Sequence, residues 1–285
     1  MAGSKIIKKT RLSENVFRMR LEAPLIAKAR KAGQFVIVRA DAEWGERIPL
    51  TIADADAEKG TIDIIFQAVG VSTKQLSMLE EGDSLADLVG PLGKPTEIAR
   101  GGRVIVVGGG IGVAPAHPIA QAMKAAGNLV TVIMGARTKD LVIMEDEMRR
   151  AADEVIVVTD DGSYGRKGLV TEPLVELLES IRNSGDKALG QCEVVVVGPP
   201  VMMKFAALAT KPFGVKTIAS LNSVMIDGTG MCGGCRVTVG GETKFVCVDG
   251  PEFDAHQVDF DNFILRLGAF RREEADHKCR SGLFS

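Results

Sequence analysis

Three cysteines and one aspartate near the C-terminal end have the types and spacing of a metal site. Cys232 and Cys235 lie two residues apart in the glycine-rich stretch DGTGMCGGC, and Cys247 follows after eleven more residues in GGETKFVCVDG. The second stretch is expected to form a hairpin, which would return Cys247 to the loop. Thiolates bind zinc and iron–sulfur clusters, so the pattern predicts a metal site that needs a fourth ligand.

Asp227 begins the same stretch and is the expected fourth ligand. A carboxylate has the same formal charge as a thiolate, so the site keeps its total charge while a harder oxygen replaces sulfur. The loop glycines would let backbone amides turn inward toward cluster sulfides, which a zinc ion does not require. The pattern therefore favours an iron–sulfur cluster, with zinc and no metal as alternatives. The glycines are Gly228, Gly230, Gly233 and Gly234.

Length and composition predict an ordinary globular chain of two or three domains. The 285 residues are 46% hydrophobic and 25% charged, and 35 Lys and Arg against 37 Asp and Glu give a net charge of −2. This balance gives no reason to expect binding to nucleic acid or to an anionic membrane. The N-terminal segment contains no apolar block of signal-peptide length, so the expected compartment is the cytoplasm. Five cysteines are not expected to form disulfides in that compartment.

One segment, 104–123, is uncharged for twenty residues, which is the length of a membrane span. Four glycines, two prolines and a histidine interrupt it. These residues predict a strand, a loop and a helix instead.

Three blocks with different patterns follow one another. Residues 1–100 alternate short β-branched runs with turn signals, which predicts an antiparallel β-barrel. Residues 101–219 contain four apolar runs separated by helical stretches, which predicts a doubly wound parallel α/β sheet. Residues 220–285 form a small, loop-rich domain whose core would be poor without a metal, and they end in an amphipathic helical pattern. The four apolar runs are 103–109, 129–136, 154–161 and 192–200.

A glycine-rich loop, VVGGGIGVAP, follows the first apolar run. It would turn the N-terminal amides of a helix outward, where they suit a pyrophosphate. Because its spacing is G-x-G-x-G-x-A-P and not G-x-G-x-x-G, a purely structural role stays open. The expected binding residues are Gly109, Gly110, Ile111, Gly112, Ala114 and Pro115.

Charged residues follow the next two runs. Arg137 stands where an adenosine ribose would lie. An arginine there can contact a 2′-phosphate or stack on adenine, so the choice between NAD and NADP stays open. Asp160 and Asp161 end the third run at the sheet edge where nucleotides bind, although Asp-Gly is also an ordinary turn.

Two segments of the first block have residues suited to an anion, although each is also compatible with an ordinary strand and turn. A guanidinium fork fits phosphate oxygens, and small hydroxyl residues beside a glycine let amides approach the same anion. The segment ERIPLTI supplies Arg47, Pro49, Leu50 and Thr51, and the segment FQAVGVSTKQL supplies Gly70, Ser72 and Thr73.

In this order, the three blocks resemble the ferredoxin-NADP reductase superfamily, in particular its branch with a C-terminal 2Fe–2S domain, over essentially the whole chain. ERIPLTI is similar to the flavin-binding Arg-x-Pro-Leu-Thr motif of that branch, GVST to its second flavin segment and GGGIGVAP to its nucleotide loop. VVGPPVMMKF resembles the segment that faces the nicotinamide, which adds Gly198, Pro199 and Met202.

The resemblance implies an oxidoreductase subunit that moves electrons between NAD(H), or alternatively NADP(H), and a partner through FAD and a 2Fe–2S cluster. It implies that Arg47 and the GVST amides hold the FAD pyrophosphate and that Thr51 contacts the flavin ring. It assigns no residue as a general acid or base. Cofactors would carry the redox chemistry, and the protein would position them.

Two families of this branch differ at the cluster. In the electron-transfer subunit of dihydroorotate dehydrogenase the ligands follow C-x4-C-x2-C, and Asp227 falls on the first of these cysteines. One aspartate with three cysteines is a feature of the small subunit of NADH-dependent ferredoxin:NADP oxidoreductase, also described as the sulfide dehydrogenase β subunit. The chain is identified as a member of this second family.

This family implies a heterodimer with a larger flavoprotein subunit that contains 4Fe–4S clusters, and electron bifurcation that involves ferredoxin. The alternatives are a dihydroorotate dehydrogenase electron-transfer subunit and a zinc-stabilised nucleotide-binding module.

Overall fold

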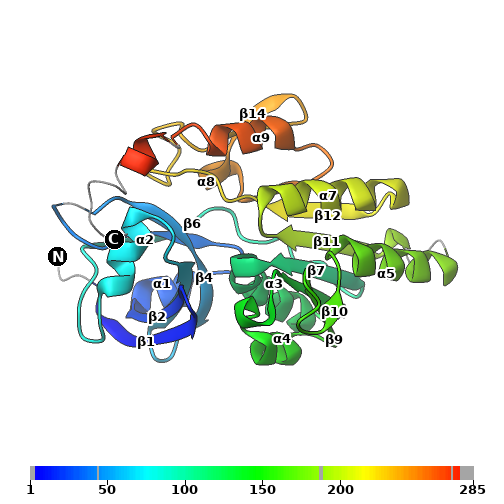
Figure 1. The fold of residues 1–285 in the computed structure, drawn as a ribbon, viewed down its shortest axis with the longest axis horizontal. Coiled ribbons are helices and arrows are strands. Elements are labelled where there is room, and N and C mark those ends of the chain that lie inside the picture. Colours follow the sequence, from blue (N-terminus) through cyan, green and yellow to red (C-terminus); the bar gives the residue numbers. More distant parts are fainter. Residues whose placement is uncertain (1–3, 44, 186–188, 271, 277–285) are drawn as a thin grey trace.

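The computed structural model describes residues 4–43, 45–185, 189–270 and 272–276. Figure 1 shows a β-barrel in blue and cyan, a helix-covered sheet in green and yellow, and a C-terminal segment in orange and red. Within the described ranges, no helix has both the length and the apolar character needed to cross a membrane.

The barrel is antiparallel, as the β-branched runs predict. Its ends are joined by backbone hydrogen bonds: the Ile6 amide donates to the Asp83 carbonyl at 2.8 Å, and the Leu85 amide donates to the Ser4 carbonyl at 2.9 Å. These bonds connect the start of the first strand to the segment before the last one, which closes the sheet on itself. In spatial order the strands are β1 (Ile6–Ser13), β2 (Val16–Glu22), β5 (Thr61–Gln67), β4 (Ile48–Asp56), β3 (Phe35–Arg39) and β6 (Asp87–Leu92). The helices of this part are α1 (Pro24–Ala29) and α2 (Val71–Met78).

The second part is a seven-stranded sheet in which the four predicted runs form neighbouring or near-neighbouring parallel strands. The strand order reverses between β7 and β11, and ligands bind at such a reversal in doubly wound sheets. In spatial order the strands are β10 (Arg166–Lys167), β9 (Glu154–Thr159), β8 (Leu129–Ala136), β7 (Arg103–Gly109), β11 (Cys192–Val197), β12 (Lys216–Ser220) and β15 (Glu252–Asp254).

Helices cover both faces of this sheet, because its central strands are apolar on both sides. Val106 packs with the helices α3 and α4 on one face, and Val107 packs with α5 and α7 on the other. Segment 104–123 forms β7, a short 3-10 turn and α3, which confirms the predicted strand, loop and helix. The helices are α3 (Val113–Ala125), α4 (Glu145–Ala151), α5 (Thr171–Asn183) and α7 (Pro200–Thr210).

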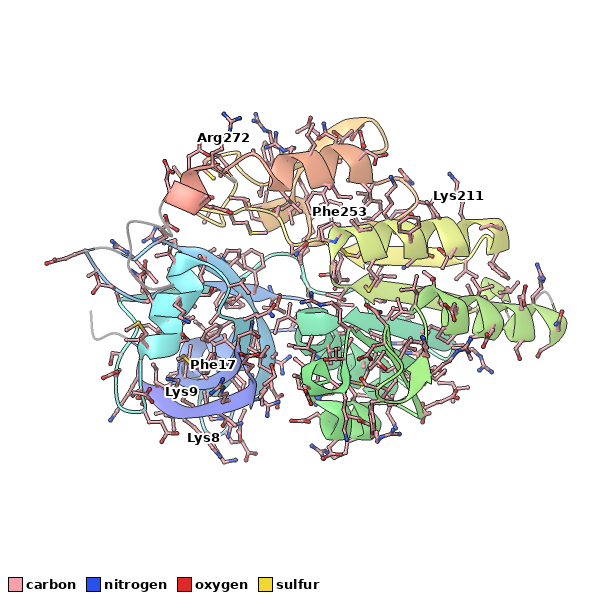
Figure 2. All side chains as sticks on the ribbon, viewed as in Figure 1. Lys8, Lys9, Phe17, Lys211, Phe253 and Arg272 are labelled. Carbon is pink, nitrogen blue, oxygen red and sulfur yellow. The ribbon has the colours of Figure 1, made fainter. Side chains whose placement is uncertain are left out.

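The C-terminal segment contains the predicted hairpin and amphipathic helix, and it shares a core with the sheet. Its strand β15 pairs antiparallel with β12, with Phe253 opposite Ala219. Figure 2 labels Phe253 where this segment meets the sheet. The core around Phe253 and Phe263 is continuous with that around Val194 of β11. This sharing offsets the low apolar content of the segment. Its other elements are β13 (Arg236–Val239), β14 (Glu242–Phe245), α8 (Val246–Asp249) and α9 (Phe260–Leu267).

Candidate functional site

A cavity of about 1470 Å³ lies at the carboxyl edge of the parallel sheet. The barrel forms one end of it through β2, β4 and β5, and the helices α5 and α7 form the other wall. Most of the residues predicted to bind flavin or nucleotide are therefore brought to one place. The predicted residues that line it are Pro49, Leu50, Thr51, Gly109, Gly110, Ile111, Gly112, Pro115, Arg137, Asp160, Gly198, Pro199 and Met202.

Close packing explains two glycines, Gly109 at the end of β7 and Gly112 in the turn after it. A Cβ on Gly112 would lie 2.4 Å from the Val197 carbonyl oxygen, and a Cβ on Gly109 would lie 2.3 Å from the Met202 sulfur. The loop thus fits against the end of β11, and the first turn of α3 follows it directly. The N-terminal end of a helix beside a cavity favours an anion such as a pyrophosphate.

Two predicted residues lie beside the cavity without lining it. Ala114 is buried and packs into the core beneath α3. Asp161 accepts hydrogen bonds from the Ser163 hydroxyl at 2.7 Å and from the Ser163 amide at 2.9 Å. These bonds lower the pKa of Asp161 and give it the role of a turn residue.

The two anion-binding segments of the barrel meet outside the cavity walls. Arg47 donates to Asp87 at 2.5 Å. Its neighbour Glu46 accepts a hydrogen bond of 2.8 Å from the Ser72 hydroxyl at the start of α2. The two segments are therefore side by side, as binding of one anion by both requires. A phosphate bound there would compete with Asp87 for the guanidinium.

The start of α2 is ordered by its own side chains. The Thr73 hydroxyl accepts a hydrogen bond from the Gly70 amide at 3.0 Å and donates one to the Gly70 carbonyl at 3.1 Å. This arrangement fixes the turn that carries Ser72.

The four predicted metal ligands form two pairs. The sulfurs of Cys235 and Cys247 are 3.2 Å apart, because the β13–β14 hairpin returns Cys247 to the loop. Asp227 accepts hydrogen bonds from the Cys232 amide at 2.9 Å and from the Cys232 thiol at 3.4 Å. In the part of the chain that is described, no three Cys, His, Asp or Glu side chains converge to hold a single ion.

This donor set fits a 2Fe–2S cluster better than a zinc ion. Structural zinc needs four ligands around one atom. A 2Fe–2S cluster instead takes two protein ligands on each of two irons. The Gly234 amide also donates to the Cys232 sulfur at 3.4 Å, so one loop amide points toward the sulfur of a predicted ligand.

The protonation of these ligands follows from their surroundings. Partial burial opposes ionisation of Asp227, but hydrogen bonds from the Thr229 and Cys232 amides outweigh it and lower its pKa to about 2. Burial and the adjacent Cys235 thiol raise the pKa of Cys247 to about 12, so metal binding at Cys247 has to release a proton. Burial also raises the pKa of Cys192 to about 11, and this cysteine lies in the sheet core, away from the ligand pairs.

The barrel positions the glycine-rich stretch 227–235, called the cluster loop below. Gly228 has a φ of +73°, and a Cβ there would lie 2.9 Å from side-chain atoms of Ile37 on β3 and Leu92 on β6. Only glycine suits both this backbone conformation and this close contact. The loop therefore lies directly on the barrel that supplies one end of the cavity.

Apart from Met202 on α7, the sequence did not predict the residues that form the helical walls of the cavity. On α7, Val201, Phe205 and Leu208 are each more than half exposed and recur at helical spacing. Such spacing is the usual signal of a helix face that packs into a core, so it did not indicate a cavity wall. The other unpredicted lining residues on or beside α5 are Arg166, Leu169, Val170, Thr171, Glu172, Val175 and Glu176.

Two family models match the chain. Residues 106–207 match the oxidoreductase NAD-binding domain, and residues 222–259 match the iron-sulfur cluster binding domain of dihydroorotate dehydrogenase B. The first match includes the glycine loop, and the second includes both ligand pairs.

Relatives of known name match most of the chain. A homolog of the dihydroorotate dehydrogenase B (NAD(+)) electron transfer subunit from Thermotoga maritima is 47% identical, covering 96% of this chain and 93% of its own length. The dihydroorotate dehydrogenase B (NAD(+)) electron transfer subunit from Caldanaerobacter subterraneus subsp. tengcongensis is 32% identical, and the match covers 90% of this chain and 98% of that subunit. A chain in the structure of an NADH-dependent reduced ferredoxin-NADP oxidoreductase, solved to study flavin-based electron bifurcation, is 45% identical, with a TM-score of 0.88 and 98% of both chains covered.

These matches confirm the resemblance that the motifs indicate, both in fold and in the order of the parts. The chain is an oxidoreductase subunit that belongs to the family of dihydroorotate dehydrogenase B electron transfer subunits and their homologs, within the ferredoxin-NADP reductase superfamily.

Proposed function

We propose that this chain is the electron-transfer subunit of an NADH-dependent ferredoxin:NADP oxidoreductase, with FAD, a 2Fe–2S cluster and a site for NAD(H). One observation carries the proposal: a single cavity joins the barrel to the nucleotide loop, and the loop with the two ligand pairs lies on the same barrel. The 45% identical chain from such an oxidoreductase supports it.

The residues divide into those that hold each group. Arg47 and the start of α2 bind the FAD pyrophosphate, and Thr51 lies at the cavity end where the flavin ring belongs. The loop after β7 binds the nucleotide pyrophosphate, and Met202 lies against that loop on the nicotinamide side. Bound flavin supplies the conversion between the two-electron chemistry of a nicotinamide and the one-electron chemistry of an iron–sulfur cluster.

Apolar side chains of the barrel give the reacting groups a dry environment. Val16 and Ile65 line the cavity near Thr51 and are almost fully buried. Excluding water there protects reduced cofactors from side reactions.

Function is tested first by the spectrum of anaerobically purified protein, with assays for flavin, iron and zinc. Flavin and iron–sulfur absorption that bleaches on addition of NADH is the expected result. A colourless protein that contains zinc would contradict the proposal. The alternative function, that of a dihydroorotate dehydrogenase subunit, is favoured by the relatives at 32% identity. Identifying the large subunit that copurifies with this chain would distinguish the two functions.

Asp227→Cys tests the unusual ligand. We expect the variant to retain a 2Fe–2S cluster with altered absorption and reduction potential, because one hard oxygen ligand becomes sulfur. Asp261→Asn is the matched control, since Asp261 is exposed on α9 and pairs with Lys204. A visible spectrum of Asp227→Cys that matches the wild type would remove Asp227 from the ligand set.

A larger subunit is expected to cover the outer side of the cluster loop. Met231 and Ile226 are 89% and 59% exposed there, and each directly precedes one residue of the Asp227–Cys232 pair in the chain. Large exposed apolar side chains next to a redox centre are suited to an interface. By the family resemblance, this partner is a flavoprotein with 4Fe–4S clusters that exchanges electrons with ferredoxin.

Met231→Asp should reduce recovery of a coexpressed large subunit about tenfold, because it places a charge in a desolvated contact. Iron content should not change. Leu25→Asp is the control, because Leu25 is 84% exposed on α1 of the barrel, away from the cluster loop. Equal recovery with both variants would place the partner elsewhere.

A further inference from the structure

The cavity has two chemically different ends. The barrel end contains Thr51, Gln67 and apolar residues but no charged residue, whereas all charged residues that line the described cavity lie at the far end. The loop after β7, at Gly109 and Gly112, lies between these ends. A dinucleotide with its pyrophosphate on that loop and its nicotinamide toward the barrel must extend its adenosine toward the charged end.

The strand order gives the direction of this extension. β8 and β9 follow β7 in the sheet at about 4.8 Å per strand. Their carboxyl ends carry Arg137 and Asp160, and both residues line the cavity. The adenosine ribose therefore belongs near these two side chains and the start of α5.

At this end the carboxylates outnumber the cations. Arg166 forms a bidentate salt bridge with Glu176: its Nη1 donates to Oε2 at 2.5 Å and its Nη2 donates to Oε1 at 2.6 Å. A carboxylate oxygen of Glu172 lies 3.5 Å from the same guanidinium. Asp160 adds a third carboxylate, and Arg137 a single further cation.

We propose that Glu176, assisted by Glu172 and Asp160, selects NAD(H) over NADP(H). The inference rests on the proposed function and adds its nucleotide specificity. A 2′-phosphate would bring nearly two negative charges toward three carboxylates. Glu176 also occupies the guanidinium fork of Arg166 that would otherwise bind that phosphate. A free 2′-hydroxyl can instead donate a hydrogen bond to a carboxylate.

Glu176→Gln in the full-length, flavin-loaded protein tests this. With ferricyanide as electron acceptor, kcat/KM for NADH should exceed that for NADPH in the wild type by at least about tenfold. In the variant, the ratio of kcat/KM for NADPH to kcat/KM for NADH should rise about tenfold, because Arg166 no longer pairs with a carboxylate at position 176. The double variant Glu172→Gln/Glu176→Gln should raise this ratio further. The gain should shrink at high ionic strength, because these charges are exposed.

Glu179→Gln is the matched control, since Glu179 is exposed on the same helix and does not line the cavity. The inference is wrong if the wild type uses both nucleotides equally, or if Glu176→Gln changes the ratio no more than the control does.

Binding of nucleotide fragments separates this inference from the proposed function. Calorimetry should show that the wild type binds 5′-AMP more tightly than 2′,5′-ADP and that Glu176→Gln narrows the difference. If Glu176→Gln narrows this difference in affinity but NADH fails to bleach the flavin, the specificity stands and the proposed function fails. If NADH bleaches the flavin but the fragments bind alike in both proteins, only the specificity fails.

Discussion

Cys247→Ala is expected to yield a protein that contains flavin but has lost its 2Fe–2S cluster. Cys247 is 1% exposed and its sulfur lies 3.2 Å from that of Cys235, so no solvent or neighbouring side chain can replace the lost ligand at that position. Iron should fall from about two atoms per chain to almost none. The barrel is expected to keep FAD, because its main core is separate from that around Cys247, to which the barrel contributes only Phe35, Ile37 and Leu92.

Iron and flavin assays on the purified variant check this expectation. Cys192→Ala is the control, because it changes another buried cysteine that lies in the sheet core. It should keep its iron and lose only some stability. A full complement of iron in Cys247→Ala would show that Cys247 is not a cluster ligand.

Gly112→Ala is expected to abolish NADH-dependent bleaching and to destabilise the sheet domain. The new Cβ would lie 2.4 Å from the Val197 carbonyl oxygen and 2.7 Å from the Gly198 Cα, both backbone atoms that cannot rotate away. Forcing them apart costs about 2 to 3 kcal/mol, as overpacking usually does. It also separates the two loops between which the nucleotide is expected to bind.

Gly190→Ala is the control, since a Cβ at Gly190 would meet no atom within 4 Å. Denaturant unfolding and flavin bleaching by NADH should both remain near wild type in the control. Normal bleaching in Gly112→Ala would mean that the β7–β11 contact adjusts at little cost and does not shape the nucleotide site.

Much of the fold could be predicted because its central strands carry a strong signal. β7, β8, β9 and β11 are buried on both faces and read as continuous apolar runs. The strands of this sheet that were missed are β10, which has two exposed residues, β12, which has five residues, and β15, which has three buried or half-buried residues. Such short segments become strands only through pairing with a neighbour, and that pairing depends on the tertiary fold.

The candidate site was predictable only where the sequence carries a strong local signal. Glycine loops and cysteine spacing are local, so a candidate nucleotide loop and four candidate metal ligands could be named from the sequence. The grouping of the ligands into two pairs could not, because the contact of Cys235 with Cys247 depends on the register of the β13–β14 hairpin. Nor could the pair of Arg166 with Glu176, which joins a strand to a helix ten residues away.

Through its strand β15, the C-terminal segment also covers an edge of the parallel sheet. Without it, β12 would be the open edge of a parallel sheet, with a row of free N–H and C=O groups that invites other chains to pair. The segment with the candidate metal ligands thus leaves only a three-residue strand at this edge of the sheet, which lowers the risk of aggregation. Because β15 and the candidate metal ligands belong to one segment, deletion of that segment would uncover β12 as well as remove the candidate cluster site.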